Sequence, residues 1–192
     1  CVYEMPEYTS VEIDEVEDWI VAEFIMKKIL HPVKELKIKL FLTDVDGVLT
    51  DAGMYYSENG DELKKFNTRD GKGFELLRNA GIKTGIITSE DTNIVSNRAN
   101  KLKVDFLFQG AGNDKFKIIS KLCAEENISF DEIAYIGDDI NDLELLSNVG
   151  LAACPQDAVT KVRNIQNICI LSSKGGEGVV REFVENILIN LK

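Results

Sequence analysis

The chain has 192 residues, of which 44% are hydrophobic, and its formal net charge at pH 7 is −11. So acidic a composition excludes a general nucleic-acid surface. Because the start is acidic and no apolar run approaches the ~18 residues of a membrane span, we predict a soluble cytoplasmic protein without a membrane segment.

Cysteine and histidine usage excludes several further classes of site. The cysteines, Cys1, Cys123, Cys154 and Cys169, form no C-x-x-C pair, so a zinc or disulfide framework is not expected. The single histidine, His31, precedes a proline in a predicted linker, which leaves a Ser-His or Cys-His nucleophile without its base. No P-loop motif occurs either.

The first predicted element is an N-terminal helix. Val16, Ile20 and Phe24 have helical spacing, as in an ordinary amphipathic helix. The stretches MPEYTSVEID (5–14) and EDWIVAE (17–23) also resemble the last part of acylneuraminate cytidylyltransferases, and the chain opens on cysteine rather than methionine. This resemblance implies that residues 1–34 are the tail of an upstream, fused cytidylyltransferase domain, and that residues 35–192 form a second domain.

A buried strand that ends in acidic residues comes next. The apolar run 38–42 precedes the octet DVDGVLTD (44–51). Asp44 and Asp46 leave the strand on the same side, Gly47 permits a tight turn, and open α/β sheets bind ligands beyond their strand ends. One carboxylate could attack phosphorus while the other transfers a proton. Acidic pairs of this kind also start turns or cap helices.

A hairpin and then alternating helices and strands follow this octet. The residues SENG (57–60) predict a hairpin turn between 54–56 and 62–66. We then predict, in order, a helix from Asp70 to Gly81, a strand to Thr88, a helix from Thr92, a strand 104–108, a helix from Asp114, a strand to Ile136, strands at 151–153 and 169–171, and a helix from Val179. This order predicts an α/β fold: a Rossmann-like, mainly parallel sheet with helices on both faces, a small β-hairpin insertion and no cap domain.

Two of these boundaries carry residues that could hold a phosphate. Thr88 and Ser89 end a strand, where a hydroxyl and backbone N–H groups suit a phosphoryl oxygen. Lys115 begins a helix and would neutralise both a nucleophile and a phosphate. Taken singly, Thr88 is better explained as a helix N-cap, and Lys115 is better explained as a solvated surface lysine.

A second acidic group, GDDIND (137–142), follows the strand-like residues 133–136. Carboxylates from two strand ends suit Mg²⁺, which favours oxygen ligands and retains several waters. Without a cation, they would repel one another and raise their own pKa values. Together the strand ends therefore predict a Mg²⁺-dependent phosphoryl-transfer site, although ligand geometry alone does not separate Mg²⁺ from Mn²⁺.

The four motifs resemble those of the haloacid dehalogenase superfamily. DVDGVLTD, IITS (86–89), Lys115 and GDDIND are similar in order and spacing to the motifs of its small cap-less phosphatases. FNTRDG (66–71) and GGEGVVRE (175–182) resemble the 3-deoxy-octulosonate 8-phosphate phosphatase group. Its sialic-acid relatives act on nonulosonate 9-phosphates. The resemblance implies a small-molecule substrate, a sugar-acid phosphate.

The resemblance also implies a role for each motif residue. Asp44 would be the nucleophile that becomes an aspartyl phosphate, and Asp46 the general acid and base. Thr88 and Lys115 would hold the phosphate. The Mg²⁺ ligands would be Asp44, the backbone carbonyl of Asp46, and Asp138, supported by Asp139 and Asp142. Substrate-binding residues would be Asn67, Thr68, Arg69, Asp70, Gly71, Ser89, Glu90, Arg98 and Lys101.

Two departures from the octulosonate group bear on the substrate. Glu75 and Glu90 stand where that group carries arginines. A glutamate repels a sugar carboxylate but accepts hydrogen bonds from hydroxyl or amide groups, which favours a nonulosonate 9-phosphate over the octulosonate. Arg98 and Lys101, one helix turn apart, could meet the sugar carboxylate, or could form a solvated helix face.

Other function classes and the assembly remain open at this point. A phospho-receiver domain uses similar residues but places its acidic pair first and its acceptor aspartate in mid-chain. A catalytically silent oligomerisation module of a cytidylyltransferase would have lost motif carboxylates. Because an uncapped aspartyl phosphate would be open to water, we expect Tyr55 and Tyr56 of the hairpin to help close a neighbouring subunit's site. The resemblance suggests a homotetramer.

Overall fold

The computed structural model describes residues 15, 18, 19, 37–60 and 62–188, with side chains described as far as residue 186. The chain divides into two units, residues 1–35 and 36–192, and the second is described below. The predicted N-terminal helix and the cytidylyltransferase-like stretches lie almost entirely outside the described residues. They stay predictions, as does the domain boundary after residue 34.

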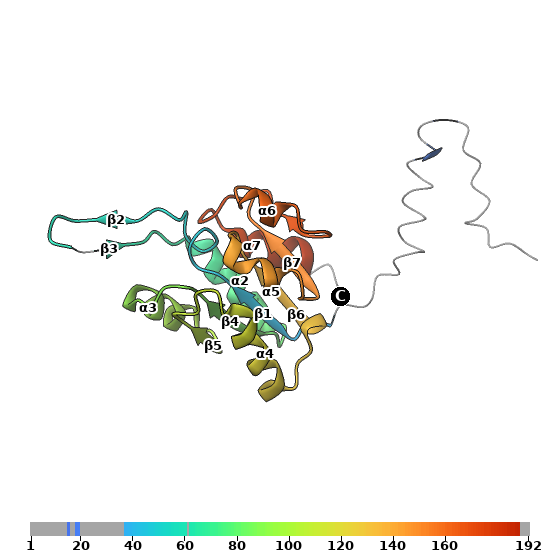
Figure 1. Cartoon of the computed structure of the whole chain (residues 1–192), viewed down its shortest axis with the longest axis horizontal. Helices are drawn as coiled ribbons and strands as arrows, with labels where there is room; N and C mark the ends of the chain where they lie inside the picture. Colours follow the sequence, from blue (N-terminus) through green and yellow to red (C-terminus); the bar gives the residue numbers. More distant parts are fainter. Residues whose placement is uncertain (1–14, 16–17, 20–36, 61, 189–192) are drawn as a thin grey trace, which may run out of the picture. The chain divides into compact units, whose positions relative to one another are not determined.

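Within the described residues, six parallel strands form one sheet in the order β5-β4-β1-β6-β7-β8 (Figure 1). The strands are β1 (Leu40–Thr43), β4 (Lys83–Ile87), β5 (Phe106–Phe108), β6 (Ile133–Ile136), β7 (Leu151–Cys154) and β8 (Cys169–Ile170). From β1 the chain adds β4 and β5 on one side, then returns to place β6 on the other. This reversal is a topological switch point, where open α/β sheets bind ligands. The predicted parallel sheet is confirmed.

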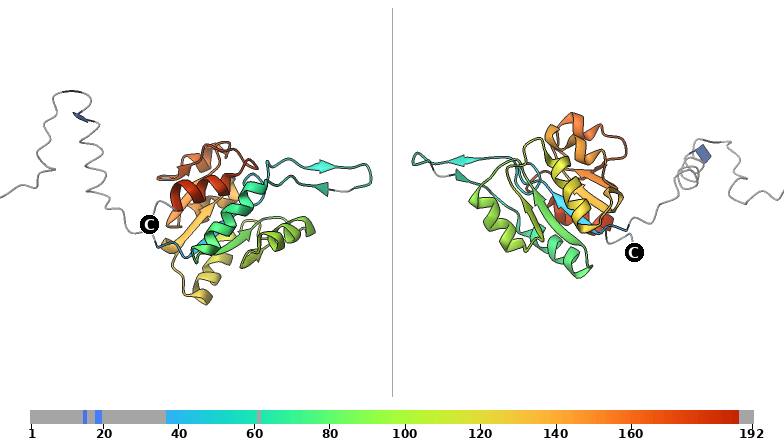
Figure 2. Two further views of the ribbon diagram at one scale, coloured as in Figure 1. Left: turned by 180° about the vertical axis from the view of Figure 1, so that it is seen from behind. Right: turned by 60° about the horizontal axis from the view of Figure 1, so that its bottom comes forward.

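Helices cover both faces of the sheet (Figure 2). Successive side chains of a strand point to opposite faces, so Phe41 packs into one apolar cluster, whereas Leu40 and Leu42 pack into the other. The Phe41 side is covered by α2 (Thr68–Asn79), α3 (Asn93–Leu102) and α7 (Val179–Phe183), and the other side by α4 (Lys115–Glu126), α5 (Leu143–Leu146) and α6 (Thr160–Arg163). Residues of β1 and β6 are therefore buried throughout, as strands covered on both faces must be.

Several boundaries differ from the prediction for local reasons. Helix α2 begins at Thr68 rather than Asp70, because the side chain of Asn67 caps it by accepting the N–H of Arg69. The short elements α5, α6, η2 (Phe130–Glu132) and η3 (Ile140–Asp142) were not predicted, since a single turn shows no periodicity. Helix α7 continues into the π-helical turn η4 (Val184–Leu188).

The predicted hairpin is present and forms an arm that projects from the rest of the domain in every view (Figures 1 and 2). It consists of β2 (Tyr55–Tyr56) and β3 (Glu62–Leu63), and Gly60 adopts the positive φ of +85° that the turn requires. Tyr55, Tyr56 and Leu63 are 57%, 67% and 65% exposed. The arm thus presents apolar surface to solvent.

Two predicted absences concern cysteine pairing and membrane helices. Cys123, Cys154 and Cys169 are free thiols, the first two of them buried. None of the helices in the described part of the chain combines the length and apolar character needed to cross a bilayer.

Candidate active site

Asp44 lies directly after β1, at the carboxyl edge of the sheet, and is only 4% exposed. Its Oδ1 accepts the backbone N–H of Val45 at 2.7 Å, and its Oδ2 lies 2.9 Å from Nζ of Lys115. Burial and the nearby charge of Asp142 raise the pKa of Asp44 to about 7, against the opposing effect of Lys115. A buried, oriented carboxylate of this kind is suited to nucleophilic attack.

Lys115 begins α4, and its side chain is fully buried. Its ammonium lies 2.9 Å from Asp44 and 2.6 Å from Oδ1 of Asp142. Burial alone would lower the pKa of Lys115, but the two carboxylates outweigh that effect and raise it. The alternative of a solvated surface lysine is therefore wrong.

Thr88 follows β4 at the same edge and is 1% exposed. Its backbone N–H donates to the carbonyl oxygen of Phe108, and its hydroxyl accepts the N–H of Glu90 at 3.4 Å. Helix α3 is capped by the side chain of Thr92 instead, so the alternative of Thr88 as an N-cap is wrong. Thr88 and Asp44 follow neighbouring strands of the sheet.

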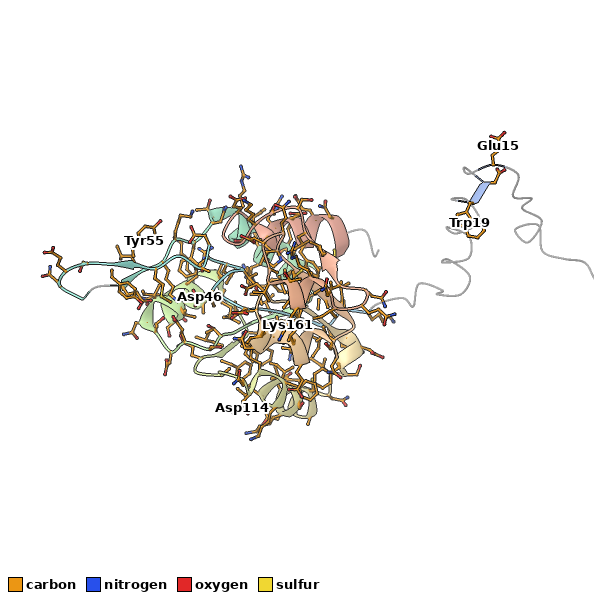
Figure 3. All side chains as sticks on the ribbon, turned by 45° about the horizontal axis from the view of Figure 1, so that its top comes forward. Glu15, Trp19, Asp46, Tyr55, Asp114 and Lys161 are labelled. Carbon is orange, nitrogen blue, oxygen red and sulfur yellow. The ribbon has the colours of Figure 1, made fainter. Side chains whose placement is uncertain are left out.

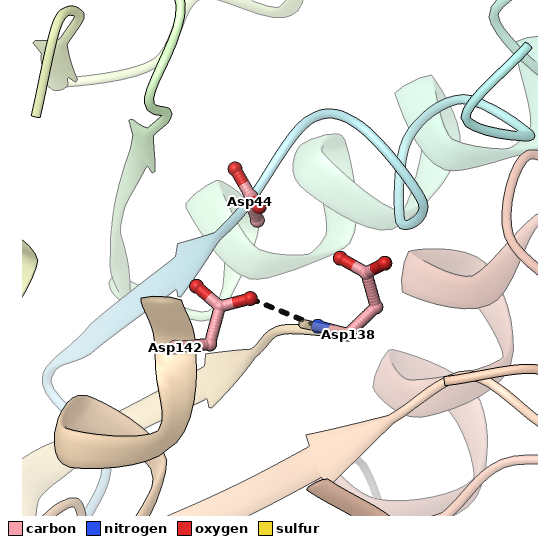
Figure 4. A group of neighbouring side chains, drawn as sticks. All are labelled: Asp44, Asp138 and Asp142. Atoms are coloured by element: carbon pink, nitrogen blue, oxygen red, sulfur yellow. Dashed lines mark hydrogen bonds between the residues drawn. The ribbon is translucent and has the colours of Figure 1, made fainter. Parts of the chain in front are cut away.

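Three carboxyl groups gather at this edge, from Asp44, Asp138 and Asp142 (Figure 4), with one oxygen of each within 4.8 Å of the others. Burial, then the charges of Asp44, Asp142 and Asp139, raise the pKa of Asp138 to about 8. Oδ1 of Asp138 is buried and has no hydrogen-bond partner among the described residues. An unpartnered carboxyl oxygen beside two further carboxylates fits a divalent cation with oxygen ligands, which confirms the predicted cation site.

Asp142 holds the neighbouring groups of this cluster in place through four hydrogen bonds. Its Oδ1 accepts hydrogen bonds from Lys115 at 2.6 Å and from the hydroxyl of Tyr135 at 2.5 Å. Its Oδ2 accepts the backbone N–H groups of Asp138 and Asp139 at 3.0 and 3.2 Å. Each oxygen of Asp142 thus accepts two hydrogen bonds, so Asp142 orients Lys115 and the loop. Each oxygen of Asp44 has a single partner and Oδ1 of Asp138 has none among the described residues, which leaves these two carboxylates to face a cation. Asp139 caps η3 by accepting the N–H of Ile140.

Two glycines let the backbone approach the cluster closely. Gly47 has a φ of +86°, and a Cβ on it would lie 2.0 Å from Oδ2 of Asp138. A Cβ on Gly175 would lie 2.2 Å from the carbonyl oxygen of Gly47. The loop after β1, the loop after β6 and the C-terminal Gly-Gly segment therefore meet at positions where no other side chain fits.

The carboxylate of Asp46 is not a member of the cluster, and the residue lies near the base of the hairpin arm that carries Tyr55 (Figure 3). Nζ of Lys64 is 2.9 and 2.7 Å from its two oxygens and also bonds to Glu90, while the hydroxyl of Thr50 donates to Oδ1 of Asp46 at 3.2 Å. Burial lowers the pKa of Lys64, but the bonds to Asp46 and Glu90 outweigh this and raise it. The side chain of Asp46 is thus bound by Lys64 and Thr50 and does not belong to the carboxylate cluster that could hold a cation.

Sequence reasoning missed Lys64 and Tyr135. Lys64 lies in the predicted second strand of a hairpin, where a lysine is an ordinary surface residue. Tyr135 lies in an apolar strand, where an aromatic residue is ordinary core. No local signal distinguishes either residue, because the partners of Lys64 are 18 and 26 residues away in the sequence and the partner of Tyr135 lies beyond the end of its strand.

The FNTRDG segment is placed at the start of α2, and Asp70 requires a correction. Asp70 is fully buried, and its Oδ1 accepts the N–H groups of Val180 and Arg181 at 3.1 and 3.3 Å. Its carboxylate therefore anchors α7 and does not face a substrate. Asn67 is also partly structural, since it caps α2 and donates to the carbonyl oxygen of Gly176 at 3.2 Å.

The remaining predicted substrate residues are scattered. Ser89 accepts a hydrogen bond from Asn141 at 2.7 Å, at the same edge as Thr88. Nη2 of Arg98 donates to the carbonyl oxygen of Asn67 at 2.7 Å, and its guanidinium stacks over Phe66. The other predicted residues, Thr68, Arg69, Gly71 and Lys101, are exposed or half-buried. Arg98 and Lys101 therefore do not form one binding surface. The alternative prediction, that both lie on a solvated helix face, holds for Lys101 but not for Arg98.

The comparisons with known proteins agree with this geometry. The family model of haloacid dehalogenase-like hydrolases matches residues 88–183. The 3-deoxy-D-manno-octulosonate 8-phosphate phosphatase of Yersinia pestis is 37% identical over 156 residues, which cover 79% of this chain and 80% of that protein.

Solved structures give the same result. The crystal structure of 3-deoxy-D-manno-octulosonate 8-phosphate phosphatase from Moraxella catarrhalis, in complex with magnesium ion, phosphate ion and KDO, is 35% identical with a TM-score of 0.77 and covers 85% of this chain and 92% of that one. A HAD superfamily (subfamily III A) hydrolase from Legionella pneumophila is 34% identical with a TM-score of 0.80, covering 90% and 92%. These relatives confirm the predicted cap-less fold and the predicted class, a phosphoric monoester hydrolase. The chain belongs to the haloacid dehalogenase-like hydrolases, in the group of the 3-deoxy-octulosonate 8-phosphate phosphatases.

Proposed function

We propose that this protein is a Mg²⁺-dependent phosphatase of a 2-keto-3-deoxy sugar-acid phosphate, with 3-deoxy-octulosonate 8-phosphate as its substrate. The observation that carries the proposal is the buried Asp44–Lys115 pair beside Asp138, at the switch point of the sheet. The relatives named for this reaction, at 35–37% identity, support the choice of substrate. The presence of every motif carboxylate argues against a catalytically silent assembly module.

In the proposed reaction, each active-site residue has a separate role. A carboxylate oxygen of Asp44 attacks phosphorus, the sugar oxygen leaves, and an aspartyl phosphate forms on Asp44. Asp46 gives a proton to the departing oxygen and then takes one from the water that hydrolyses the intermediate. Lys115, Thr88 and Ser89 stabilise the phosphoryl oxygens. Asp44, Asp138 and the backbone carbonyl of Asp46 would hold Mg²⁺, which supplies positive charge to the phosphate when bound.

A second candidate substrate is a nonulosonate 9-phosphate, either deaminated or N-acetylated at C5. The observation that favours it is the position of Glu90. Its carboxylate and that of Asp46 both form ion pairs with the ammonium of Lys64, so Glu90 lies near the proposed proton-transfer group. A glutamate there accepts hydrogen bonds from the hydroxyl or amide groups of a longer sugar. Glu75 does not bear on the choice, because it pairs with Lys72 on the surface of α2. Under this reading, a fused cytidylyltransferase domain would activate the free sugar that the phosphatase releases.

We further propose a cytoplasmic homotetramer in which the hairpin of one subunit covers the active site of a neighbour. The exposed Tyr55, Tyr56 and Leu63 on the arm support this, as does the cap-less fold of the relatives. Arg98 and Lys101 remain candidates for meeting the sugar carboxylate, together with Asn67, Thr68, Arg69 and Gly71 at the start of α2.

The proposal is tested by phosphate release, with Mg²⁺ and with EDTA, from octulosonate 8-phosphate and from deaminated and N-acetylated nonulosonate 9-phosphates. We expect Mg²⁺-dependent turnover that falls by at least about 10³-fold in Asp44→Asn, because the amide cannot act as the nucleophile. Asp114→Asn, an exposed cap residue without a side-chain cap bond, is the matched control and should retain full activity. Preference for a nine-carbon substrate would select the second candidate, and absence of turnover on all three would promote the silent module.

A further inference from the structure

Lys64 is a lysine whose side chain has no exposed surface, although it lies in the chain segment that returns from the hairpin arm. Its Nζ contacts both oxygens of Asp46, at 2.9 and 2.7 Å, and bonds to Oε2 of Glu90. A third carboxylate, Glu62, lies 3.9 Å away, and its Oε1 has no hydrogen-bond partner within the described part of the chain. One ammonium thus holds together carboxylates from three segments of the chain.

This arrangement determines where the carboxylate of Asp46 points. Lys64 binds both of its oxygens, and Thr50 adds one bond of 3.2 Å to Oδ1. Without the ammonium, Asp46 and Glu90 would be like charges in one partly buried space and would repel each other. The position of the proton-transfer group therefore depends on a residue that lies outside the four motifs.

We propose that Lys64 is a positioning residue of the phosphatase reaction, which holds Asp46 in line with the leaving oxygen and ties it to Glu90 on the substrate side. The inference rests on the proposed function, in which Asp46 is the general acid and base. Lys64 does not touch the phosphate in this proposal. It acts only through the orientation of Asp46.

Substrates with different leaving groups separate this role from a general structural one. A sugar alkoxide is strongly basic, so it needs a proton from Asp46 as it leaves. p-Nitrophenolate is a weak base and leaves without a proton. Loss of an oriented Asp46 should therefore impair hydrolysis of the sugar phosphate far more than hydrolysis of p-nitrophenyl phosphate.

The experiment compares Lys64→Met, Lys64→Arg and Lys65→Met on both substrates with Mg²⁺, using octulosonate 8-phosphate, or a nonulosonate 9-phosphate if that is turned over faster. We expect Lys64→Met to lower kcat on the sugar phosphate ~10²-fold and on p-nitrophenyl phosphate less than about threefold. Lys64→Arg should regain most of the loss, because it restores the charge. Lys65, whose side chain is 60% exposed and pairs with Asp51 at 2.8 Å, is the matched control and should behave as the wild type.

A double-mutant cycle provides a second measurement. If Lys64 acts through Asp46, the variant that combines Asp46→Asn with Lys64→Met should be no slower than Asp46→Asn alone. Additive losses, equal losses on both substrates, or a Lys64→Met variant as active as the wild type would overturn the inference. A wild-type protein that hydrolyses neither substrate would overturn the proposed function and the inference together.

Discussion

Asp44 and Asp46 are two residues apart, yet each pairs with its own buried lysine. Asp44 contacts Lys115 at 2.9 Å among the clustered carboxylates, whereas Asp46 contacts Lys64 at 2.7 Å near the hairpin. Neighbouring carboxylates in different environments can serve as nucleophile and as proton donor in the same reaction. In the proposed mechanism, the different roles of Asp44 and Asp46 therefore follow from the lysine that each side chain contacts.

At the same scale, the raised pKa values of Asp44 and Asp138, about 7 and 8, predict that Mg²⁺ binding depends on pH. In the metal-free protein these carboxyls hold protons that a cation must displace, so affinity should rise as the pH rises from 6 to 8. Isothermal titration with Mg²⁺ at these two pH values measures the change. Asp138→Asn should bind much more weakly at both, and equal wild-type affinities at pH 6 and pH 8 would contradict the prediction.

At the scale of elements, the start of α2 is joined to α7 by one buried carboxylate. Asp70 accepts two N–H groups from the first turn of α7 through Oδ1, while its Oδ2 is buried without a hydrogen-bond partner among the described residues. Burial raises the pKa of Asp70 to about 6 from its ordinary value of 3.8, despite those two bonds and the charge of Arg98. The anchor is therefore costly when it is ionised.

This shift predicts the pH dependence of stability. Well below pH 3.8 the carboxyl of Asp70 is protonated in both the folded and the unfolded state. Between about pH 3.8 and pH 6 it is ionised in the unfolded chain but still largely protonated in the folded one, so the free energy of unfolding falls as the pH rises. The penalty at pH 7 is on the order of 2–3 kcal/mol. Asp70→Asn keeps an acceptor for α7 without the charge, so its stability relative to the wild type should be greater at pH 7 than at pH 4.

Urea denaturation of the wild type and Asp70→Asn at pH 4 and pH 7 measures this difference. Asp114→Asn, an exposed substitution of the same chemistry, is the control and should show nearly the same difference from the wild type at both pH values. A stability difference for Asp70→Asn that does not change with pH would show that Asp70 is not the group responsible.

At the scale of the whole molecule, the hairpin arm with exposed aromatic residues predicts self-association. Replacing Tyr55 and Tyr56 by serine removes large apolar side chains that are 57% and 67% exposed, so we expect the proposed tetramer to dissociate. Activity should fall as well, because each site then loses the proposed contribution of the neighbouring subunit's hairpin. Sedimentation velocity gives the oligomeric state, with Ile170→Ser, 50% exposed on β8, as the control. A wild-type protein that is a fully active monomer would contradict the prediction.

Much of the fold was predictable from the sequence because its signals are local. These buried strands are short apolar runs, and predicted site residues come at or soon after their ends, as Asp44 directly follows β1 and Asp138 comes two residues after β6. Parallel strands with intervening helices bring such ends to one edge of a sheet. Single-turn helices were missed, since they are too short to show a period.

The sequence by itself determined the order of strands and helices and the residues at the carboxyl edge, because neighbouring residues encode both. Only the tertiary structure decided which polar groups contact one another. It pairs Lys64 with Asp46 and Glu90, Tyr135 with Asp142, and Asp70 with the backbone N–H groups at the start of α7. Most of these pairs lie far apart in the sequence. A lysine in a hairpin strand has the same local sequence pattern whether it faces solvent or a buried partner, and so does an aspartate in the first turn of a helix. Only the packing of the folded chain distinguishes the exposed position from the buried one.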